Sequence, residues 1–472
     1  MKRKTKIICT IGPSVDNKIM IEKLIDAGMN VARLNFSHAN HQEHSNRIRL
    51  VRELASEKNK IIGIMADTKG PEIRIGSFKN GSVNLKKGQK FVIFNSTVEG
   101  NEKQGYINVP ELFNDIDIGD YILVDDGKVR LDVNKKEEGC LICSVFNSGK
   151  VKSNKGVNVP NVKLTMPFLS SKDKEDIKFS VKNGVDMLAL SFVRRKEDVV
   201  EVKELLKSLN SPNIEIIAKI ENQEGVDNLD EIMNEVNGVM VARGDLGVEV
   251  STQMVPIFQK KIIAKANQLG KPVITATHML ESMMTSPRPT RAEANDIANA
   301  ILDGSDAIML SGETAAGEYP IESVLTMDTI AKAIEKTIDY EEKLSKAVKF
   351  AGNSVSDAIG VAVAQASLTL PKAEVIMAFT ETGGTAKRLS RFRPSVPIIA
   401  ITDSKETARK LTYYCGVYSS IQKESNDISE YDRVAKKVAI EKLFKKGTTI
   451  IITSGWAQRH GTTNTLRIID VD

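Results

Sequence analysis

Eight apolar runs, each ending in polar or charged residues, recur along the chain and restrict its fold more than any other feature. They cover residues 6–12, 30–38, 61–70, 186–193, 214–222, 238–245, 272–279 and 306–313. Helix-like segments such as 17–28 and 196–209 lie between most of them. Strands alternating with helices in this way predict an α/β protein built on a (β/α)8 (TIM) barrel. Parallel strands buried on both faces explain why the runs are continuously apolar.

One interval in this series is too long for a single βα unit. More than a hundred residues separate the third run from the fourth, against ~30 for such a unit. Short strand-like runs joined by Gly, Asn and Asp turns fill the interval, so we expect an inserted β-rich domain over 71–167. The barrel domain would then comprise 1–70 and 168–340, with the insertion on its active-site face as a lid. A further series of strand-like runs predicts a separate α/β domain over 341–472.

Composition and terminal sequence narrow the class of protein. Among the 472 residues, 66 are basic and 61 acidic, and the two signs are interspersed, which argues against a nucleic-acid partner. The basic N-terminal start is followed by an apolar run too short for a signal peptide, and no run approaches the ~18 residues of a membrane helix. Four cysteines in so long a chain do not make a disulfide framework. We therefore expect a cytoplasmic protein with no membrane partner.

Two local motifs invite a metal or redox interpretation that we do not favour. Cys140 and Cys143 form a C-x-x-C, but a strand would place them on opposite faces, and no second pair accompanies them. His38, His41 and His44 lack the i, i+4 geometry of zinc proteases, so a solvated first helical turn is favoured for His41 and His44. The sequence contains neither a Walker motif nor a GxGxxG, which excludes the usual phosphate loops.

The polar residues that end the eight runs converge if the barrel closes. The set comprises Arg33, Asn35, Ser37, Asp67, Lys69, Lys219, Glu221, Asp245 and Thr277. Lys219 and Glu221 lie two residues apart in a strand, so they point the same way. Carboxylates on adjacent strand ends, Glu221 and Asp245, suit Mg²⁺ or Mn²⁺. With Lys219, Arg33 and Arg74 nearby, such a site is built for phosphate and for phosphoryl transfer.

Each of these residues also has an ordinary structural explanation. A Lys-x-Glu pair at a strand end is commonly a plain ion pair, and Thr277 alone would be a core residue. Asn35, Ser37 and Asp67 could cap the helices that follow their strands. Independent caps and pairs need not assemble one cation site, and their convergence is what favours the functional interpretation.

The C-terminal part carries a second candidate site, for a phosphorylated effector. Residues 379–394 predict a strand, a Thr/Gly-rich loop and a basic helix, whose backbone N–H groups could cradle phosphate. The candidate ligands are Thr380, Thr382, Gly383, Gly384 and Thr385. A capped turn is an equally good interpretation, because Glu381 would repel an anion if it pointed inward. Trp456 lies in another Gly/Thr loop that could close over the same site.

Long blocks of the sequence resemble a known family. They are "TKIICTIGPS", "AGMNVARLNFSH", "ADTKGPEIRIG", "KIENQEGVDNLDEI", "VARGDLGVE", "ATHMLESMMTSPRPTRAE" and "IMLSGETAAGEYP". These resemble the signature blocks of pyruvate kinases, and the resemblance extends from residue 5 to the C-terminal "TTNTLRI". It implies a (β/α)8 barrel, an inserted β-barrel domain and a C-terminal α/β domain, usually assembled as a homotetramer. No additional C-terminal domain of the kind found in some bacterial relatives is expected.

The resemblance implies a reaction and a role for each matching residue. The reaction is phosphoryl transfer from phosphoenolpyruvate to ADP, giving pyruvate and ATP in the final step of glycolysis. Glu221 and Asp245 would hold Mg²⁺, and Lys219 would stabilise the moving phosphoryl group and the enolate oxygen. Arg33 would bind the substrate phosphate, while its carboxylate would be received by Gly244, Asp245 and Thr277. K⁺ would be bound by Asn35, Ser37, Asp67 and Thr68, and the nucleotide by Asn35, His38, Arg74 and Lys172.

Several features leave alternatives open. Relatives with Lys at the position of Glu72 dispense with K⁺, so this sequence is expected to need it. His278 stands where Gln is common, and the loop with Glu381 departs from the clearest fructose-1,6-bisphosphate-binding forms. The enolate could be protonated by Thr277 or through water near Ser311 and Glu313. A metal-dependent barrel lyase or aldolase acting on an oxo-acid, or a non-catalytic regulatory relative, are the competing functions, although a lyase needs no nucleotide site.

Overall fold

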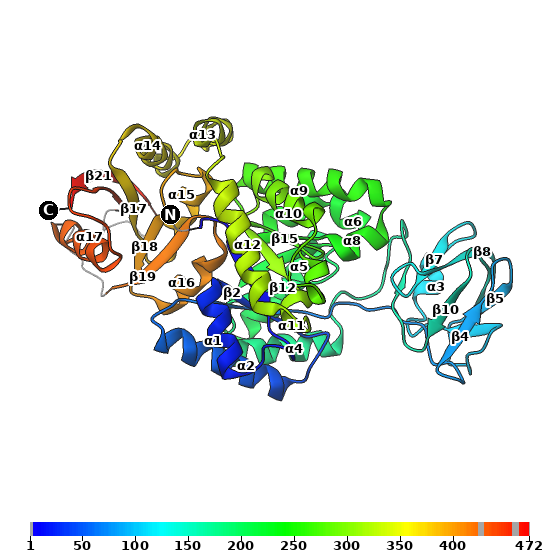
Figure 1. Cartoon of the computed structure of the whole chain (residues 1–472). Coiled ribbons are helices and arrows are strands. Elements are labelled where there is room, and N and C mark those ends of the chain that lie inside the picture. The colour runs from blue at the N-terminus through cyan, green and yellow to red at the C-terminus, as the bar shows by residue number, and fades with distance from the viewer. Residues whose placement is uncertain (1–2, 423–428, 456–461, 472) are drawn as a thin grey trace.

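The protein is described by a computed structural model over residues 3–422, 429–455 and 462–471. Trp456 lies outside these residues, so its predicted closure over the effector loop is not addressed. Within the described ranges, no helix combines the length and apolar character needed to span a membrane. Figure 1 shows three parts along the molecule, with the barrel between a β-rich insertion and a C-terminal sheet with its helices.

Eight parallel strands form a closed barrel in the order β1-β16-β15-β14-β13-β12-β3-β2. Their bounds are β1 (Lys6–Thr10), β2 (Val31–Asn35), β3 (Gly63–Asp67), β12 (Met187–Leu190), β13 (Glu215–Ile220), β14 (Gly238–Ala242), β15 (Val273–Ala276) and β16 (Ala307–Leu310). Every strand residue is buried except Asn35, which is partly exposed. Each predicted run contains one of these strands, so the barrel prediction is confirmed.

Helices surround the barrel, and capping residues set where they begin. The longer ones are α1 (Lys18–Ala27), α2 (His41–Glu57), α4 (Ser171–Lys182), α5 (Lys196–Ser208), α9 (Val255–Leu269), α10 (Arg291–Asp303) and α12 (Pro320–Glu335). Asn40 caps α2 and Thr290 caps α10, each in a capping box with a Glu three residues later. The shorter helices are α6 (Gln223–Asp227), α7 (Leu229–Glu235), α8 (Arg243–Glu249) and α11 (Gly312–Ala315).

The interval between β3 and β12 folds as a β-rich unit with its own apolar core. A curled six-stranded sheet has the order β11-β7-β8-β9-β5-β6, and β10 pairs with β4 in a two-stranded sheet. The bounds are β4 (Ser82–Leu85), β5 (Lys90–Phe94), β6 (Gln104–Tyr106), α3 (Leu112–Asp115), β7 (Tyr121–Val124), β8 (Val129–Glu137), β9 (Cys140–Val145), β10 (Gly149–Lys152) and β11 (Val157–Asn158). In β9, Cys143 is buried and Cys140 only partly so, because residues three apart lie on opposite faces.

The C-terminal part is an α/β unit with a five-stranded sheet of order β19-β18-β17-β20-β21, in which only β21 is antiparallel. Its strands are β17 (Ala373–Phe379), β18 (Ile398–Thr402), β19 (Val417–Ile421), β20 (Thr449–Ser454) and β21 (Thr465–Asp470). Its helices are α13 (Tyr340–Val348), α14 (Val355–Thr369), α15 (Gly384–Arg391), α16 (Lys405–Lys410) and α17 (Ser429–Glu441).

The C-terminal unit docks on the N-terminal end of the barrel through paired charges. Buried carboxylates near the starts of three barrel strands each receive a basic side chain, in the pairs Asp186–Arg409 (2.7 Å), Glu215–Lys387 (2.6 Å) and Asp306–Arg393 (2.9 Å). The hydroxyl of Tyr413 donates a further hydrogen bond to Glu215 (2.9 Å). These carboxylates are satisfied within the protein, which leaves the opposite end of the barrel for chemistry.

Candidate active site

Lys219 and Glu221 lie at the C-terminal end of β13 and meet on one face. Lys219 Nζ lies 2.9 Å from Glu221 Oε1 and 3.1 Å from Asp67 Oδ1, which comes from β3. Ile220, between them in sequence, points the other way into the layer under the helices. The side chains of Lys219, Glu221 and Asp67 are all at least nine-tenths buried, so a buried cation is held between two carboxylates.

Asp67 connects this pair to Arg33 and to a residue that the sequence analysis missed. Arg33 Nε donates to Asp67 Oδ2 (2.7 Å), and its Nη1 donates to the Thr10 hydroxyl (2.9 Å). Ser191, just after β12, accepts a hydrogen bond from Lys219 Nζ (2.7 Å) and donates to Thr68 O (2.6 Å). Ser191 ends an apolar run in the same way as the predicted residues, and that signal could have found it.

The charges at this site are incompletely balanced. Burial opposes the charge on Lys219, yet Asp67, Glu221 and Asp245 together raise the Lys219 pKa above its ordinary value. Burial, with repulsion from Asp245, raises the pKa of Glu221 to about 8 despite the nearby lysine. Glu221 Oε2 accepts the Phe192 N–H (2.6 Å), whereas Oε1 is buried with no aligned hydrogen bond. One lysine beside Glu221 therefore does not offset burial and the charge of Asp245.

Asp245, Gly244 and Thr277 are brought together by the loops after β14 and β15. Asp245 lies in the first turn of α8, which begins directly after β14. The Gly244 N–H donates to the Thr277 hydroxyl (2.7 Å). Thr277 and His278 have φ angles of +66° and +53°, a left-handed conformation that is unfavourable for a β-branched residue. Strain of this kind is typical of functional loops.

Arg243 supports this strained loop and is a second residue that the sequence analysis missed. Its Nη2 donates to Thr277 O (2.6 Å), and its Nη1 pairs with Asp296 at 2.7 Å. Arg243 directly precedes the predicted site residues Gly244 and Asp245 in "RGDLG". Its partner Asp296 lies in α10, far away in the sequence, so no local pattern indicated its contacts. We infer that Arg243 fixes the backbone of Thr277.

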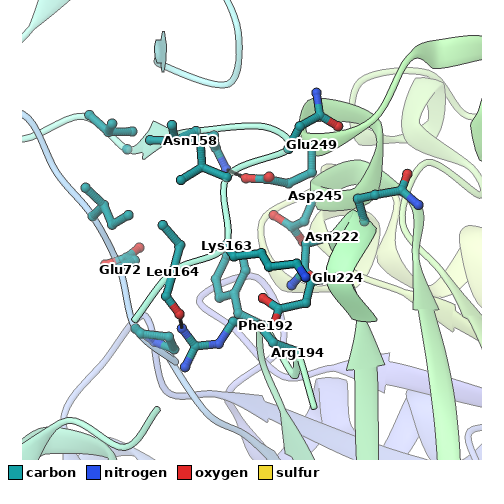
Figure 2. A pocket seen from close by; sticks show the side chains of 18 of the residues that line it. Glu72, Asn158, Lys163, Leu164, Phe192, Arg194, Asn222, Glu224, Asp245 and Glu249 are labelled. Atoms are coloured by element: carbon teal, nitrogen blue, oxygen red, sulfur yellow. Dashed lines mark hydrogen bonds between the residues drawn. The ribbon is translucent and has the colours of Figure 1, made fainter. Parts of the chain in front are cut away.

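A cleft of about 200 Å³ lies between the β-rich insertion and the barrel, beside Asp245 (Figure 2). Asn158 of β11 donates to Glu249 Oε1 of α8 across this cleft (2.7 Å). Burial raises the pKa of Glu249 to about 7, although the Asn158 hydrogen bond opposes the rise. The two parts of the chain therefore meet next to the candidate metal ligands.

The four residues predicted to bind K⁺ come from the adjacent ends of β2 and β3. Asn35 and Asp67 are register partners. Asn35 Oδ1 accepts the Ser37 N–H (3.0 Å), which is the capping interaction considered as the alternative, and Thr68 is buried against Ser191. The Asp67 side chain pairs with Arg33 and Lys219 instead of capping a helix. Burial opposes its charge, but these two cations lower its pKa.

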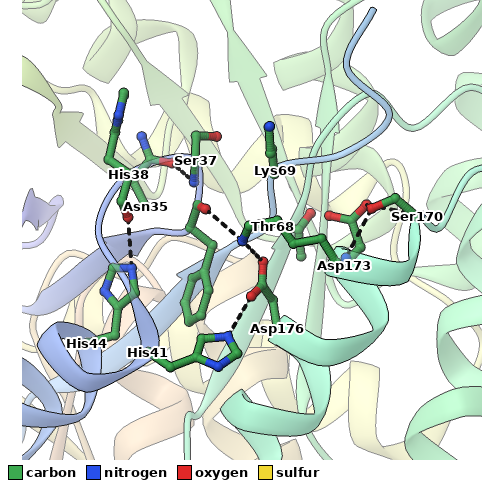
Figure 3. A network of polar contacts seen from close by, with 12 residues as sticks. Asn35, Ser37, His38, His41, His44, Thr68, Lys69, Ser170, Asp173 and Asp176 are labelled. Atoms are coloured by element: carbon green, nitrogen blue, oxygen red, sulfur yellow. Dashed lines mark hydrogen bonds and ion pairs between the residues drawn. The ribbon is translucent and has the colours of Figure 1, made fainter. Parts of the chain in front are cut away.

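The predicted nucleotide residues fall into two groups. His38 is exposed, and Figure 3 shows it near His41 and Asp176, which come from α2 and α4. Asp176 holds His41 Nε2 at 2.6 Å and the half-exposed Lys172 Nζ at 2.5 Å. Arg74 instead leads into the insertion, paired with Glu72 at 2.7 Å. Glu72 also binds Lys69 (2.8 Å), so this acidic side chain has two basic partners.

His44 corrects one prediction. It is 1% exposed rather than solvated, and its ring stacks on Phe36 at 4.3 Å. It occupies the inward face of α2 together with Arg47, Ile48 and Val51, a helical spacing that the local histidine pattern obscured. His41 is 43% exposed, in closer agreement with the prediction.

Comparison with known proteins identifies the family. The family models described as "Pyruvate kinase, barrel domain" and "Pyruvate kinase, alpha/beta domain" match residues 2–324 and 357–469. The chain is 49% identical over 470 residues to the pyruvate kinase of Sporosarcina psychrophila, covering 99% of this chain and 80% of that one. The chain belongs to the pyruvate kinase family. It is also 47% identical to the pyruvate kinase of Geobacillus stearothermophilus, with the same two coverages.

A solved pyruvate kinase structure shares the whole fold. The enzyme from Cryptosporidium parvum superimposes with a TM-score of 0.95 at 38% sequence identity, covering 100% of this chain and 96% of that one. The chain is thus a phosphotransferase of the pyruvate kinase family, which favours the kinase interpretation over an oxo-acid lyase.

The loop proposed for a phosphorylated effector starts α15. Gly383 has φ +88° at the helix N-cap, a conformation that favours glycine, and its N–H donates to the Thr380 hydroxyl (2.9 Å). The Thr385 hydroxyl bonds that of Thr463 (2.9 Å). Thr382 and Gly384 are exposed, as is Glu381. This arrangement is that of a capped turn, and it leaves the effector interpretation as a prediction.

Proposed function

We propose that this member of the pyruvate kinase family transfers a phosphoryl group from phosphoenolpyruvate to ADP at the C-terminal end of the barrel. The observation that carries the proposal is the buried Glu221 beside Lys219, with the partly exposed Asp245 close enough to raise the pKa of Glu221. In the described part of the chain, no group of three or more His, Cys, Asp or Glu side chains could hold a metal. A metal at these two carboxylates would therefore take further oxygens from substrate and water, as Mg²⁺ commonly does.

Glu221 and Asp245 are the residues that would hold Mg²⁺ or Mn²⁺. The fit is supported by the buried Glu221 carboxyl, whose pKa is raised although Lys219 Nζ lies 2.9 Å away, and by Asp245, whose negative charge contributes to that rise. The bound metal would neutralise charge on the phosphoryl oxygens. Lys219 and Arg33 would contribute fixed positive charge from the protein itself, already oriented by Asp67.

The remaining site assignments follow the same logic. Gly244, Asp245 and Thr277 are proposed to receive the substrate carboxylate, supported by the hydrogen bond that joins Gly244 N–H to the Thr277 hydroxyl at the start of α8. Asn35, His38, Arg74 and Lys172 are proposed for ADP. Asn35, Ser37, Asp67 and Thr68 are proposed for K⁺, supported by the acidic Glu72 at the position where K⁺-independent relatives carry Lys.

We further propose the division of the chain into a catalytic barrel domain (1–70 and 168–340), a lid (71–167) and a regulatory domain (341–472). The Asn158–Glu249 hydrogen bond across the cleft supports a lid that contacts the barrel beside Asp245. A homotetramer, a phosphorylated effector at the loop before α15 and a cytoplasmic location remain predictions from the sequence.

The deciding experiment is pyruvate release from phosphoenolpyruvate, ADP and Mg²⁺, run in parallel with K⁺ and with Na⁺ alone. Activity only with K⁺ is the expected result, and it would support the reaction together with the roles of Glu72 and the four K⁺ residues. Equal activity with both ions would retain the kinase and refute the K⁺ site. No pyruvate with either ion would refute the proposed function in favour of a non-catalytic relative.

A further inference from the structure

A second cavity, of about 430 Å³, lies at the opposite end of the barrel from the candidate active site. It is lined by the C-terminal ends of α9, α10 and α12, by α13 and by the segment that follows α15. Its volume lies within the range typical of small-molecule sites. The cavity includes Lys4 and Asp303, which lie near the N-terminal ends of the barrel strands, whereas Glu221 lies at the C-terminal end of its strand.

One wall of this cavity is apolar and includes side chains exposed to solvent. Ile301 and Ile338 line it from the barrel side, and Ala347 and Phe350 from α13 and its end. Phe350 is 48% exposed, and Leu302, near the end of α10, is 41% exposed. Large apolar side chains facing a cavity of this size suit a ligand with an apolar body.

Three cations at the cavity have no carboxylate partner within 4.0 Å among the described residues. Lys4 Nζ donates to Pro394 O (2.8 Å) and Ser395 O, and Lys343 Nζ donates to Leu302 O (2.6 Å). Arg391 Nη2 donates to Gln268 O (2.9 Å) and Phe350 O, while its Nε is buried without a hydrogen-bond partner. All these acceptors are neutral main-chain carbonyls, so they satisfy hydrogen bonds without adding negative charge. The lining holds five basic side chains and only two carboxylates, Asp303 and Glu335.

The acidic groups nearby are already engaged. Asp303 pairs with Lys260 at 2.5 Å, and the two oxygens of Glu335 accept the N–H groups of Lys4 (2.8 Å) and Thr5 (2.7 Å). The second Asp303 oxygen, Oδ2, is buried without a partner and could accept a hydrogen bond from a ligand hydroxyl.

The other two cations of the lining have their own carboxylates, because Arg393 pairs with Asp306 and Lys346 with Glu342. Burial also lowers the pKa of Lys4 to about 8 and the pKa values of Lys343 and Arg391. Positive charge in this cavity is therefore in excess.

We propose that this cavity binds a small organic anion, in which a carboxylate or phosphate monoester is carried on an apolar body. The anionic group would lie against Lys343 and Arg391, and the body against Phe350 and Leu302. The inference rests on the cavity and its charges alone, and it is independent of the proposed kinase reaction.

Phenyl phosphate is a suitable probe, because it combines a phosphate monoester with an apolar ring. Its dissociation constant for the full-length protein would be measured by calorimetry, beside inorganic phosphate and benzyl alcohol, which each supply half of the chemistry. We expect phenyl phosphate to bind at least ~10-fold more tightly than either. Lys343→Glu should weaken phenyl phosphate at least ~10-fold, since it reverses one charge of the basic excess in the cavity lining.

Lys349→Glu is the matched control, because Lys349 ends the same helix, is exposed and does not line the cavity. It should bind phenyl phosphate like the wild type. Phe350→Ser should weaken phenyl phosphate while leaving inorganic phosphate unchanged, and this variant provides the test if Lys343→Glu does not fold. Absence of binding at millimolar phenyl phosphate would overturn the proposal. Equal binding by wild type, Lys343→Glu and Phe350→Ser would place the probe elsewhere and overturn it too.

Discussion

Replacing Lys219 by Met tests whether the buried cation acts on the reaction or only holds the strands together. Met retains most of the aliphatic length of Lys and removes its charge. Asp67 would keep its pair with Arg33 at 2.7 Å, and the loss of Lys219, which lowers the pKa of Glu221, would favour the neutral form of that carboxyl. Because neither carboxylate is then left as an isolated buried charge, we expect the variant to fold.

The expected loss of turnover follows from the position of the charge. Lys219 Nζ is about nine-tenths buried and held by Asp67 and Glu221, so it is preorganised in a site of low polarity. Removing one preorganised group that stabilises developing charge typically costs ~10²–10³ in kcat, or about 2.7–4 kcal/mol. The KM for phosphoenolpyruvate should change by less than ~3-fold, because the interaction is made mainly in the transition state.

Steady-state pyruvate release at saturating Mg²⁺ measures both constants. Lys196→Met is the matched control, since Lys196 forms an exposed ion pair with Glu231 (3.2 Å) on the outer helices and should leave kcat unchanged. A kcat for Lys219→Met within tenfold of the wild type, in a folded variant, would refute the catalytic role. A large rise in KM with unchanged kcat would assign Lys219 to substrate binding instead.

Two further predictions concern the lid contact and the predicted nucleotide residues. Burial raises the pKa of Glu249 from 4.5 to about 7, so the folded protein retains a proton that the unfolded chain loses between those pH values. The free energy of unfolding should therefore fall by at most about 3 kcal/mol as pH rises from 4.5 to 7. Urea titrations of the metal-free protein measure this dependence on pH, and Glu249→Gln should remove it. If the free energy of unfolding changed with pH equally in the wild type and in Glu249→Gln, the prediction would be wrong. Asp176→Asn should raise the KM for ADP and leave the KM for phosphoenolpyruvate unchanged, because Asp176 holds Lys172 at 2.5 Å. Equal changes in the two KM values would instead indicate a general loss of structure.

The sequence predicts the barrel well because each strand is a local pattern. A parallel strand covered on both faces is apolar throughout, and its polar ending marks the active-site rim, so Lys219, Glu221 and Asp67 could be placed before the fold was known. Partners far apart in sequence could not be placed in this way. Lys387 reaches Glu215 across 172 positions, and no local pattern around either residue indicates the other.

Local sequence patterns also could not predict backbone strain or which face of a helix is buried. Thr277 was predicted to bind substrate, but no local pattern indicates its left-handed backbone or the hydrogen bond that its carbonyl accepts from Arg243 in the preceding loop. His44 belongs to the inward face of α2, but its neighbouring histidines suggested an exposed turn. In both cases, tertiary contacts decide what the residue does.

The two ends of the barrel differ in where the basic partners of their buried carboxylates come from. At the N-terminal end, carboxylates such as Glu215 and Asp306 each have a basic partner from the C-terminal unit, so changing them should affect docking and folding. At the C-terminal end, Lys219 of the barrel itself lies between Glu221 and Asp67, yet burial and the charge of Asp245 still raise the pKa of Glu221. Helix α15 starts at the proposed effector loop, contacts Glu215 through Lys387 and ends with Arg391 at the second cavity, so one rigid element touches three charged regions. Glu215 is the first residue of β13, and Glu221 directly follows this strand, so a ligand that orders either end of α15 would have one route to the candidate active site through β13.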